Sequence, residues 1–341
     1  MDESPANRQG LGFIQAPRIN PGTQKKSELP GWIKRIIESW RPQPVQASRK
    51  PSLSESFSQD YGSGAMDFTG RDVDGRLDEL SQRILLDGAV CKQVCRLVRR
   101  SVKDGCVPVT FCAGRIPALG SISGHAMGKV EAGTLSVTDA SSACLIWLDL
   151  FGNMDSRIAS YLQYLTRCPA AFLLHELFPQ KPKDLPGFEW IRPWLSVTRA
   201  AVIGLQDPSH NEIQFLEEKG IQYCTVDNLV SRGAEECITA ALMAINPRND
   251  LPVHLVINVF ALDLTAAPDA PPEVGGKILV QDMLIVLDAV LHSGRLGAVD
   301  ILEVDQVAPE EVARATEVIN KVLKCVSAQV KRETVQMSFE L

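Results

Sequence analysis

The sequence contains few of the residues that usually build a hydrolytic metal site. Its 341 residues include only five histidines, and none closely follows a predicted strand end or pairs with an acid at metal-ligand spacing. We interpret them as surface or satisfied polar residues; they are His125, His175, His210, His254 and His292. The chain also lacks a G-x-S-x-G nucleophile elbow and a phosphate-binding loop. The usual signatures of catalysis are therefore missing.

Long apolar runs and basic blocks are missing as well. No apolar stretch approaches the length that crosses a bilayer, and the net charge is -6 without a cluster of basic residues. We therefore expect neither a membrane nor a nucleic-acid partner. The polar, acidic N-terminus does not resemble a secretory signal, so we expect a cytoplasmic location. A weak match to a peroxisome-like import signal is the alternative; it involves Arg8, Gln9, Gln15 and Ala16.

None of the nine cysteines forms a C-x-x-C pair, so neither a zinc site nor a thioredoxin-type motif is indicated. Several lie in apolar runs, where a thiol behaves as a small hydrophobic group, and this usage suits a reducing compartment. Cys91 and Cys95 are one helical turn apart on a predicted helix. We interpret the thiols as core or half-core residues, of which exposed members could cross-link subunits under oxidation.

Apolar strands alternate with amphipathic helices over most of the chain. The strands are apolar on both faces, which predicts a doubly wound, mostly parallel α/β sheet with helices on both faces. The predicted strands are 11–14, 107–112, 143–148, 200–205, 221–225, 253–259 and 298–304. The predicted helices are 30–40, 77–103, 116–128, 156–166, 170–177, 211–219, 233–245, 281–293 and 309–329.

The chain is expected to form one domain. Residues 1–8 are assigned to an N-terminal tail and residues 9–341 to a single α/β domain, because no internal repeat or composition break appears after residue 80. Residues 41–78 are rich in Pro, Ser, Gly and Asp. This composition predicts a long, irregular and partly mobile excursion.

The strand that ends at Leu148 offers the natural place for chemistry. In an open parallel sheet, ligands bind at the carboxyl ends of the strands. Asp149 follows this strand, with Phe151 and Asn153 shortly after it, so the strand end offers one acid, one phenyl ring and one amide. Arg115 lies in a turn between another predicted strand and a helix, where an anion site is conceivable.

The last two thirds of the chain resemble the arginases, a family of ureohydrolases. The resemblance rests on blocks that include LGSISGHA (119–126), LIWLDL (145–150), HLVINVFALDL (254–264) and ILEVDQVAPEEVARA (301–315). These blocks follow the family's order and nearly its spacing, which implies a three-layer arginase-like fold over almost the whole chain. The family hydrolyses L-arginine to ornithine and urea with a water bound between two manganese ions.

The resemblance places six positions of this chain on the family's metal-ligand motifs. One acid is kept, and the other five positions have changed to residues that do not ligate or ligate weakly. The six positions hold Arg115, Asp149, Phe151, Asn153, Asn258 and Phe260. One carboxylate and two amides cannot hold two dications. We therefore expect no metal and no other cofactor, although manganese is the cofactor of the family.

The resemblance keeps two acids on the substrate side. Glu303 aligns with the acid that accepts the guanidinium, and Glu212 aligns with an acid near the substrate's amino group. The positions that hold the amino acid or carry protons are lost, and they hold Asp155, Leu162, Thr166 and Ser209.

We expect Arg115 to pair with Asp149, with Glu303 as a second partner, so that a built-in cation replaces the metal charge. Phe151 and Phe260 would then fill the vacated volume and dry the pocket. Without a metal there is no activated water, and an arginine-paired carboxylate is a poor base. The resulting expectation is a catalytically inactive protein without arginase activity that has a binding, regulatory or assembly role.

Two alternatives stay open. The chain could be a ureohydrolase-type hydrolase of amidine C–N bonds with a remodelled, metal-independent site. It could also be a sensor of guanidine or amino-acid ligands that uses Glu303 and Glu212. For assembly, the resemblance implies a homotrimer, with a dimer of trimers as a larger form.

Overall fold

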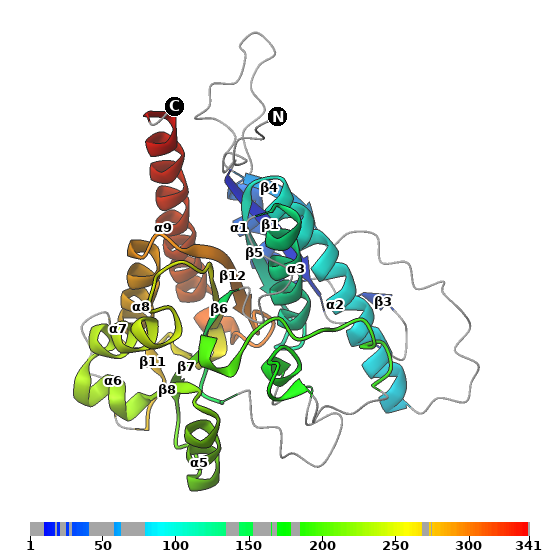
Figure 1. Cartoon of the computed structure of the whole chain (residues 1–341). Coiled ribbons are helices and arrows are strands. Elements are labelled where there is room, and N and C mark those ends of the chain that lie inside the picture. Colours follow the sequence, from blue (N-terminus) through cyan, green and yellow to red (C-terminus); the bar gives the residue numbers. More distant parts are fainter. Residues whose placement is uncertain are drawn as a thin grey trace.

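The computed structural model has an eight-stranded sheet at its centre, in which every pair of neighbouring strands is parallel (Figure 1). The structure describes residues 10–17, 19–20, 25–26, 29–40, 58–62, 79–133, 143–152, 165, 169–178, 185–267, 273 and 275–339. The strands, in sheet order, are β4 (Ser58–Gly62), β1 (Gly10–Ala16), β5 (Cys106–Cys112), β12 (Leu296–Leu302), β9 (Val253–Asn258), β6 (Cys144–Leu148), β7 (Ala200–Leu205) and β8 (Gln222–Thr225).

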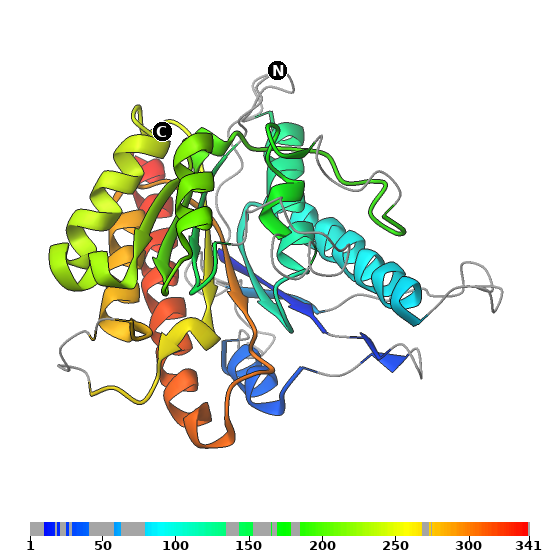
Figure 2. The same ribbon diagram turned by 90° about the horizontal axis from the view of Figure 1, so that it is seen from below.

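Helices cover both faces of this sheet (Figure 2). One face carries α2 (Glu79–Lys103), α3 (Ala118–Glu131) and α5 (His210–Lys219). The other carries α1 (Gly31–Trp40), α6 (Val226–Arg232), α7 (Ala234–Ile245), α8 (Val280–His292) and α9 (Val312–Phe339). Two small pairs of strands complete the described part: β2 (Ile19–Asn20) with β3 (Lys25–Lys26), and β10 (Leu262–Asp263) with β11 (Ile278–Leu279). The expected three-layer α/β architecture, a doubly wound parallel sheet with helices on both faces, is confirmed.

Alternation along the strands divides the core into two layers. Successive strand residues point to opposite faces, so Val109 and Phe111 of β5 join the layer under α7 to α9, whereas Cys112 joins the layer under α2 and α3. All seven residues of β5 are buried. A strand buried on both faces is apolar at most of its positions, which is why the apolar runs predicted these strands correctly.

Glycines bring α3 close to α2. A methyl group at Gly120 or Gly124 would collide with the backbone oxygen of Cys91 or Cys95 on the facing helix. The small-residue face of α3 therefore packs on a helix, and through that contact it fixes α2 over the sheet. The two helices hold the turn before α3, which carries Arg115, at one end of the sheet.

A buried polar network ties α3 to three strands. Asp300 of β12 accepts a hydrogen bond from Ser121 (2.6 Å) and lies 3.0 Å from the Nε2 atom of His254 on β9. Thr110 of β5 lies 3.0 Å from the Ser121 hydroxyl, and the Nδ1 atoms of His254 and His125 are 3.3 Å apart. All of these side chains are fully buried. The hydrogen bond of Ser121 with Asp300 satisfies groups that would be costly to bury alone, whereas Nε2 of His254 and Oδ2 of Asp300 lie close together without hydrogen-bond geometry.

The structure differs from the sequence-based prediction in several segments. Within 41–78, expected to be irregular, residues 58–62 form the edge strand β4. The helix expected over 170–177 is a short 3-10 turn at Pro169–Phe172, because the chain beyond it pairs with Leu195 instead of continuing a helix. Helix α6 was not predicted, and the helix expected over 156–166 lies outside the described residues apart from Leu165. No described helix has the length and apolar character that a membrane span requires.

Candidate active site

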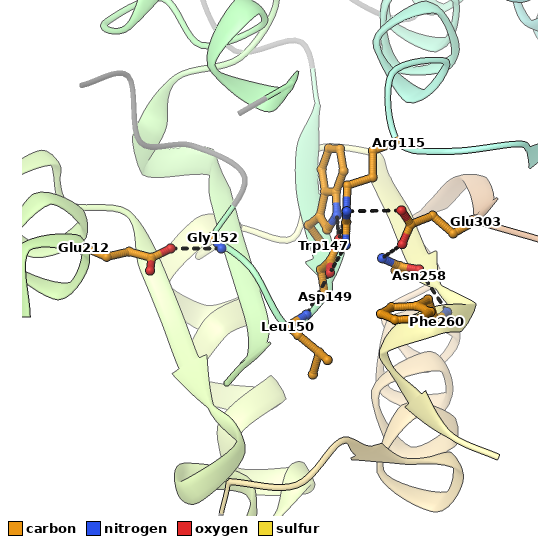
Figure 3. A network of polar contacts seen from close by, with 9 residues as sticks. All are labelled: Arg115, Trp147, Asp149, Leu150, Gly152, Glu212, Asn258, Phe260 and Glu303. Carbon is orange, nitrogen blue, oxygen red and sulfur yellow. Dashed lines mark hydrogen bonds and ion pairs between the residues drawn. The ribbon is translucent and has the colours of Figure 1, made fainter. Parts of the chain in front are cut away.

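Four neighbouring strands end at one place, and each delivers a polar side chain to it (Figure 3). Asn258 is the last residue of β9, and Glu303 follows β12 directly. Asp149 follows β6, and Arg115 lies in the turn after β5. These strands are adjacent in the sheet, so side chains far apart in sequence meet at the carboxyl edge, where ligands bind in such folds.

The centre of the site is an ion pair between Arg115 and Asp149. The Nε atom of Arg115 donates to Oδ2 of Asp149 at 2.8 Å, and Nη2 donates to Oδ1 at 3.0 Å. The Asp149 carboxylate is fully buried and also accepts hydrogen bonds from the indole of Trp147 (3.3 Å) and the backbone N–H of Leu150 (2.8 Å). This confirms the predicted pairing, and both oxygens of Asp149 are engaged.

Glu303 forms the second arm of the same cluster. Its Oε1 atom lies 3.1 Å from Nη1 of Arg115, and its Oε2 atom accepts a hydrogen bond from the Asn258 amide at 2.7 Å. The other end of that amide accepts the backbone N–H of Phe260 at 3.0 Å. Asn258 can therefore point its NH₂ group only at Glu303, and it fixes the orientation of that carboxylate.

The backbone of Glu303 is strained. Its φ angle is +55°, in the left-handed region that a side chain with a Cβ atom disfavours. Such a conformation costs about 1–3 kcal/mol and persists only where the surroundings hold it. Here the contacts with Arg115 and Asn258 hold the carboxylate at the strand end. Strained residues of this kind are common at functional sites. Among the charged residues of this site, Glu303 is the one with a positive φ angle.

Burial raises the pKa of the Glu303 carboxyl above its ordinary value. Arg115 and the Asn258 hydrogen bond oppose this shift, while Asp149 and Asp305 add to it, and the net direction is upward. For Arg115, burial alone would lower the pKa, but the hydrogen bonds and charge of Asp149, with the charge of Glu303, raise it. The site thus combines a permanent cation with a carboxyl that holds its proton more strongly than usual.

The two phenylalanines do not fill the site as predicted. Phe151 is 54% exposed and Phe260 is 43% exposed. The Arg115 guanidinium lies 5.1 Å from the centre of the Phe151 ring, and the Lys277 ammonium lies 4.6 Å from that of Phe260. The prediction was wrong because the Arg115 side chain itself spans the space between the carboxylates, so the rings stand at the rim.

The substrate-side acid Glu212 lies at the start of α5, beside the chain that leaves β6. It accepts the backbone N–H of Gly152 at 3.1 Å (Figure 3). The Ser209 hydroxyl accepts the N–H of Glu212 and caps α5. Both side chains therefore make contacts within the chain. The remaining predicted positions lie outside the described residues; they are Asn153, Asp155, Leu162 and Thr166.

Sequence reasoning missed three contributors to the site. Trp147 precedes Asp149 by two residues on a strand and so shares its face, which was a usable signal for their hydrogen bond. The positioning of Glu303 by Asn258 and the contact of Lys277 with Phe260 join segments far apart in sequence. No local sequence pattern predicts such contacts.

The residues at this site do not fit two manganese ions. Both oxygens of Asp149 accept hydrogen bonds from a guanidinium, which is itself a cation at the place where a metal would bind. Within the described ranges, no group of three or more His, Cys, Asp or Glu side chains could hold a metal ion. Phenylalanine supplies no ligand atom at two of the positions.

The fold and the position of the site define the class of protein. A parallel sheet with this strand order, covered by helices on both faces and with its polar cluster at the carboxyl edge, is a doubly wound α/β fold with its site at the carboxyl ends of the strands. The Arginase family model matches residues 46–327, so the chain belongs to the arginase family, whose activity is enzymatic.

Relatives and solved structures agree with this assignment. Mitochondrial arginase-2 of Homo sapiens is 28% identical over 245 residues, which cover 70% of this chain and 66% of that protein. Arginase-1 of Rattus norvegicus is 28% identical over 230 residues, covering 67% and 68%. The chain thus spans about two thirds of the length of these relatives. The solved arginase of Bacillus subtilis aligns with a TM-score of 0.64 at 16% identity, covering 93% of this chain and 98% of that one.

These comparisons overturn the expectation of a catalytically inactive protein with a binding, regulatory or assembly role. The relatives carry the names of arginases, and the solved structures of similar fold are named arginases, a formimidoylglutamase and an agmatine ureohydrolase. Nothing among them indicates loss of activity. A ureohydrolase-type hydrolase with a remodelled site, which was the alternative, fits these findings better.

Proposed function

We propose that this chain is a ureohydrolase-type hydrolase that breaks a C–N bond of a guanidine or amidine without a metal ion. The proposal rests on the position and surroundings of Glu303. It lies at the carboxyl edge of the sheet, on a strained backbone, with a raised pKa and with Arg115 and Asn258 holding its two oxygens. A carboxyl whose pKa is shifted toward neutral pH suits a group that takes and returns a proton.

The charge of the cluster supports a cationic substrate. One guanidinium and two carboxylates leave one unit of negative charge when Glu303 is ionised. A guanidinium or amidinium ion carries one positive charge, so it would neutralise the cluster. Arg115 holds Asp149 and Glu303 in place and prevents a larger excess of negative charge from collecting in a partly buried site.

In the proposed reaction, the ionised Glu303 carboxylate accepts a proton from a water molecule as the water oxygen bonds to the central carbon of the substrate. This step gives a neutral tetrahedral intermediate. Glu303 then returns the proton to the departing nitrogen, and the C–N bond breaks to give a neutral amine and an O-protonated urea or amide. The hydroxyl proton of that product passes to the amine, which leaves as an ammonium ion together with the neutral urea or amide. Asn258 keeps the Glu303 carboxylate oriented through both transfers.

The test is product formation in the presence of a strong chelator. The full chain is incubated with L-arginine, agmatine, methylguanidine and benzamidine in water enriched in oxygen-18, and the urea or amide is analysed by mass spectrometry. We expect one heavy oxygen in the product, formed at the same rate with and without chelator. Absence of product from every substrate, or a rate that disappears on chelation, would contradict the proposal.

A further inference from the structure

Two exposed phenylalanines at the rim of the site indicate what kind of ligand the site binds. The large apolar side chains that the described part of the chain exposes are Phe151, Met243, Phe260 and Ile285. Two of the four belong to the segments that follow β6 and β9, and these strands deliver Asp149 and Asn258 to the site. Both rings therefore stand beside the polar cluster, where the apolar part of a bound ligand would contact them.

Both rings are held in place from the site side. Phe151 lies under the guanidinium that pairs with Asp149. The backbone N–H of Phe260 is bonded to Asn258, and its ring lies beside the ammonium of Lys277. Their exposure is therefore not that of a loosely attached surface side chain. Phe151 stands two residues after Asp149, and Phe260 stands two residues after Asn258. Both rings are therefore close to the polar side chains that would hold the cationic end of a substrate.

The polar side chains expected at the other end of the substrate are already engaged. Ser209 caps helix α5 by accepting the N–H of Glu212. The carboxylate of Glu212 accepts the N–H of Gly152, directly after Phe151. A methyl group at Gly152 would reach within 2.5 Å of that carboxylate, so the contact is tight. The Oε1 atom of Glu212 and the Ser209 hydroxyl thus make contacts within the wall of the site.

We infer that the site selects guanidines and amidines whose remote end is apolar, with Phe151 and Phe260 as specificity-determining residues. The charged head is attracted by the net negative cluster of Arg115, Asp149 and Glu303, and an alkyl or aryl tail packs on the two rings. A tail with its own ammonium and carboxylate gains nothing from phenyl surface and loses part of its hydration there. This inference deepens the proposed function and rests on it for the nature of the head group.

Calorimetric titration of the full chain separates the inference from the reaction, because binding needs no turnover. Benzamidine supplies the amidinium with an aryl tail, methylguanidine the head with almost no tail, and L-arginine the head with a charged tail. We expect benzamidine to bind about tenfold tighter than either, since an aromatic contact contributes about that much. Phe151→Ala and Phe260→Ala should each remove most of this preference, because the loss of a ring weakens the binding of benzamidine far more than that of methylguanidine.

Both rings are exposed, so these substitutions should not unfold the chain. Met243→Ala, which removes an even more exposed side chain on α7 away from the site, is the matched control and should keep the preference. The inference is overturned if L-arginine binds as tightly as benzamidine, if neither binds, or if the phenylalanine variants keep the parent's preference. Tight benzamidine binding without any hydrolysis would contradict the proposed reaction alone, whereas hydrolysis with a preference for L-arginine would contradict only this inference.

Discussion

Arg115 determines the charge and the geometry of the site. In this family the corresponding place is expected to hold a metal ligand, and here a guanidinium makes two hydrogen bonds to one buried carboxylate and an ion pair to another. A guanidinium can match a carboxylate in this bidentate way because its donors form a rigid planar fork. The charge that neutralises Asp149 is thus covalently part of the chain.

Replacing Arg115 with alanine should destabilise the protein strongly. Asp149 is fully buried, and without its partner it would be an uncompensated charge, at a cost of about 3–5 kcal/mol. Urea unfolding measures this difference. Arg232→Ala is the matched control, because the Arg232–Glu236 pair is largely exposed and its loss should change stability little. Equal effects of the two substitutions would contradict the role given to Arg115.

Glu303 should leave a signature in the pH dependence of stability. Its folded-state pKa is raised above the ordinary value of 4.5, so the folded chain binds its proton more strongly than the unfolded chain. The stability associated with this group is present below pH 4.5 and is lost as the pH rises through the raised folded-state pKa. Glu303→Gln replaces the carboxyl with an amide that does not titrate, so the variant does not lose this stability as the pH rises. Unfolding at a series of pH values should therefore show a smaller decline for the variant in that window, and identical slopes would contradict the raised pKa.

At the scale of elements, the contact between α2 and α3 positions the turn that carries Arg115. Gly120→Ala would force a methyl group against the backbone oxygen of Cys91, and overpacking of this kind costs about 1–3 kcal/mol. Thermal or urea unfolding should show the loss. Gly31→Ala in α1 is the control, because the nearest atom to its added methyl group would be 3.8 Å away, and it should be neutral or slightly stabilising. Similar losses in both variants would argue against the close contact.

The elements differ in how far the sequence predicts them. The central strands were predictable because burial on both faces demands continuous apolar residues. Strand β4, with the sequence SQDYG, was not, because an edge strand that pairs only with β1 needs no such pattern. Helix α6 begins with a capping box between Thr225 and Asn228, and this sequence signal could have predicted the helix.

The candidate site was predictable in its charges but less so in its shape. The exchange of a metal ligand for Arg115 beside Asp149 predicts an ion pair, because a buried carboxylate needs a cation when the metal ligands are lost. The exposure of Phe151 and Phe260 was not predictable, because it depends on how the Arg115 side chain occupies the space between strands that are distant in sequence. Residues 153–164, which directly follow Gly152, lie outside the described part of the chain. The homotrimer implied by the resemblance stays a prediction.

At the scale of the whole molecule, the buried network around Asp300 joins the helical layer to the middle of the sheet. Asp300→Ala would leave the Ser121 hydroxyl without its buried acceptor and His254 without the carboxylate that faces it, and we expect a loss of about 1–3 kcal/mol in urea unfolding. Asp288→Ala removes the acid of another His–Asp pair, with His292, that is exposed, and it should cost little. Comparable effects would show that the network does not hold the layers together.

The central claim, that residues of the chain replace the metal pair in hydrolysis, is tested most directly by the initial rate of the chelated protein with and without Glu303. The rate of urea or amide release is measured for the parent, for Glu303→Gln and for the control Glu236→Gln, whose carboxyl is exposed on α7. We predict that the parent and the control turn over equally and that Glu303→Gln loses at least about 100-fold, the usual contribution of a general base. A Glu303→Gln variant as active as the parent, or a chelated parent without activity, would contradict the account.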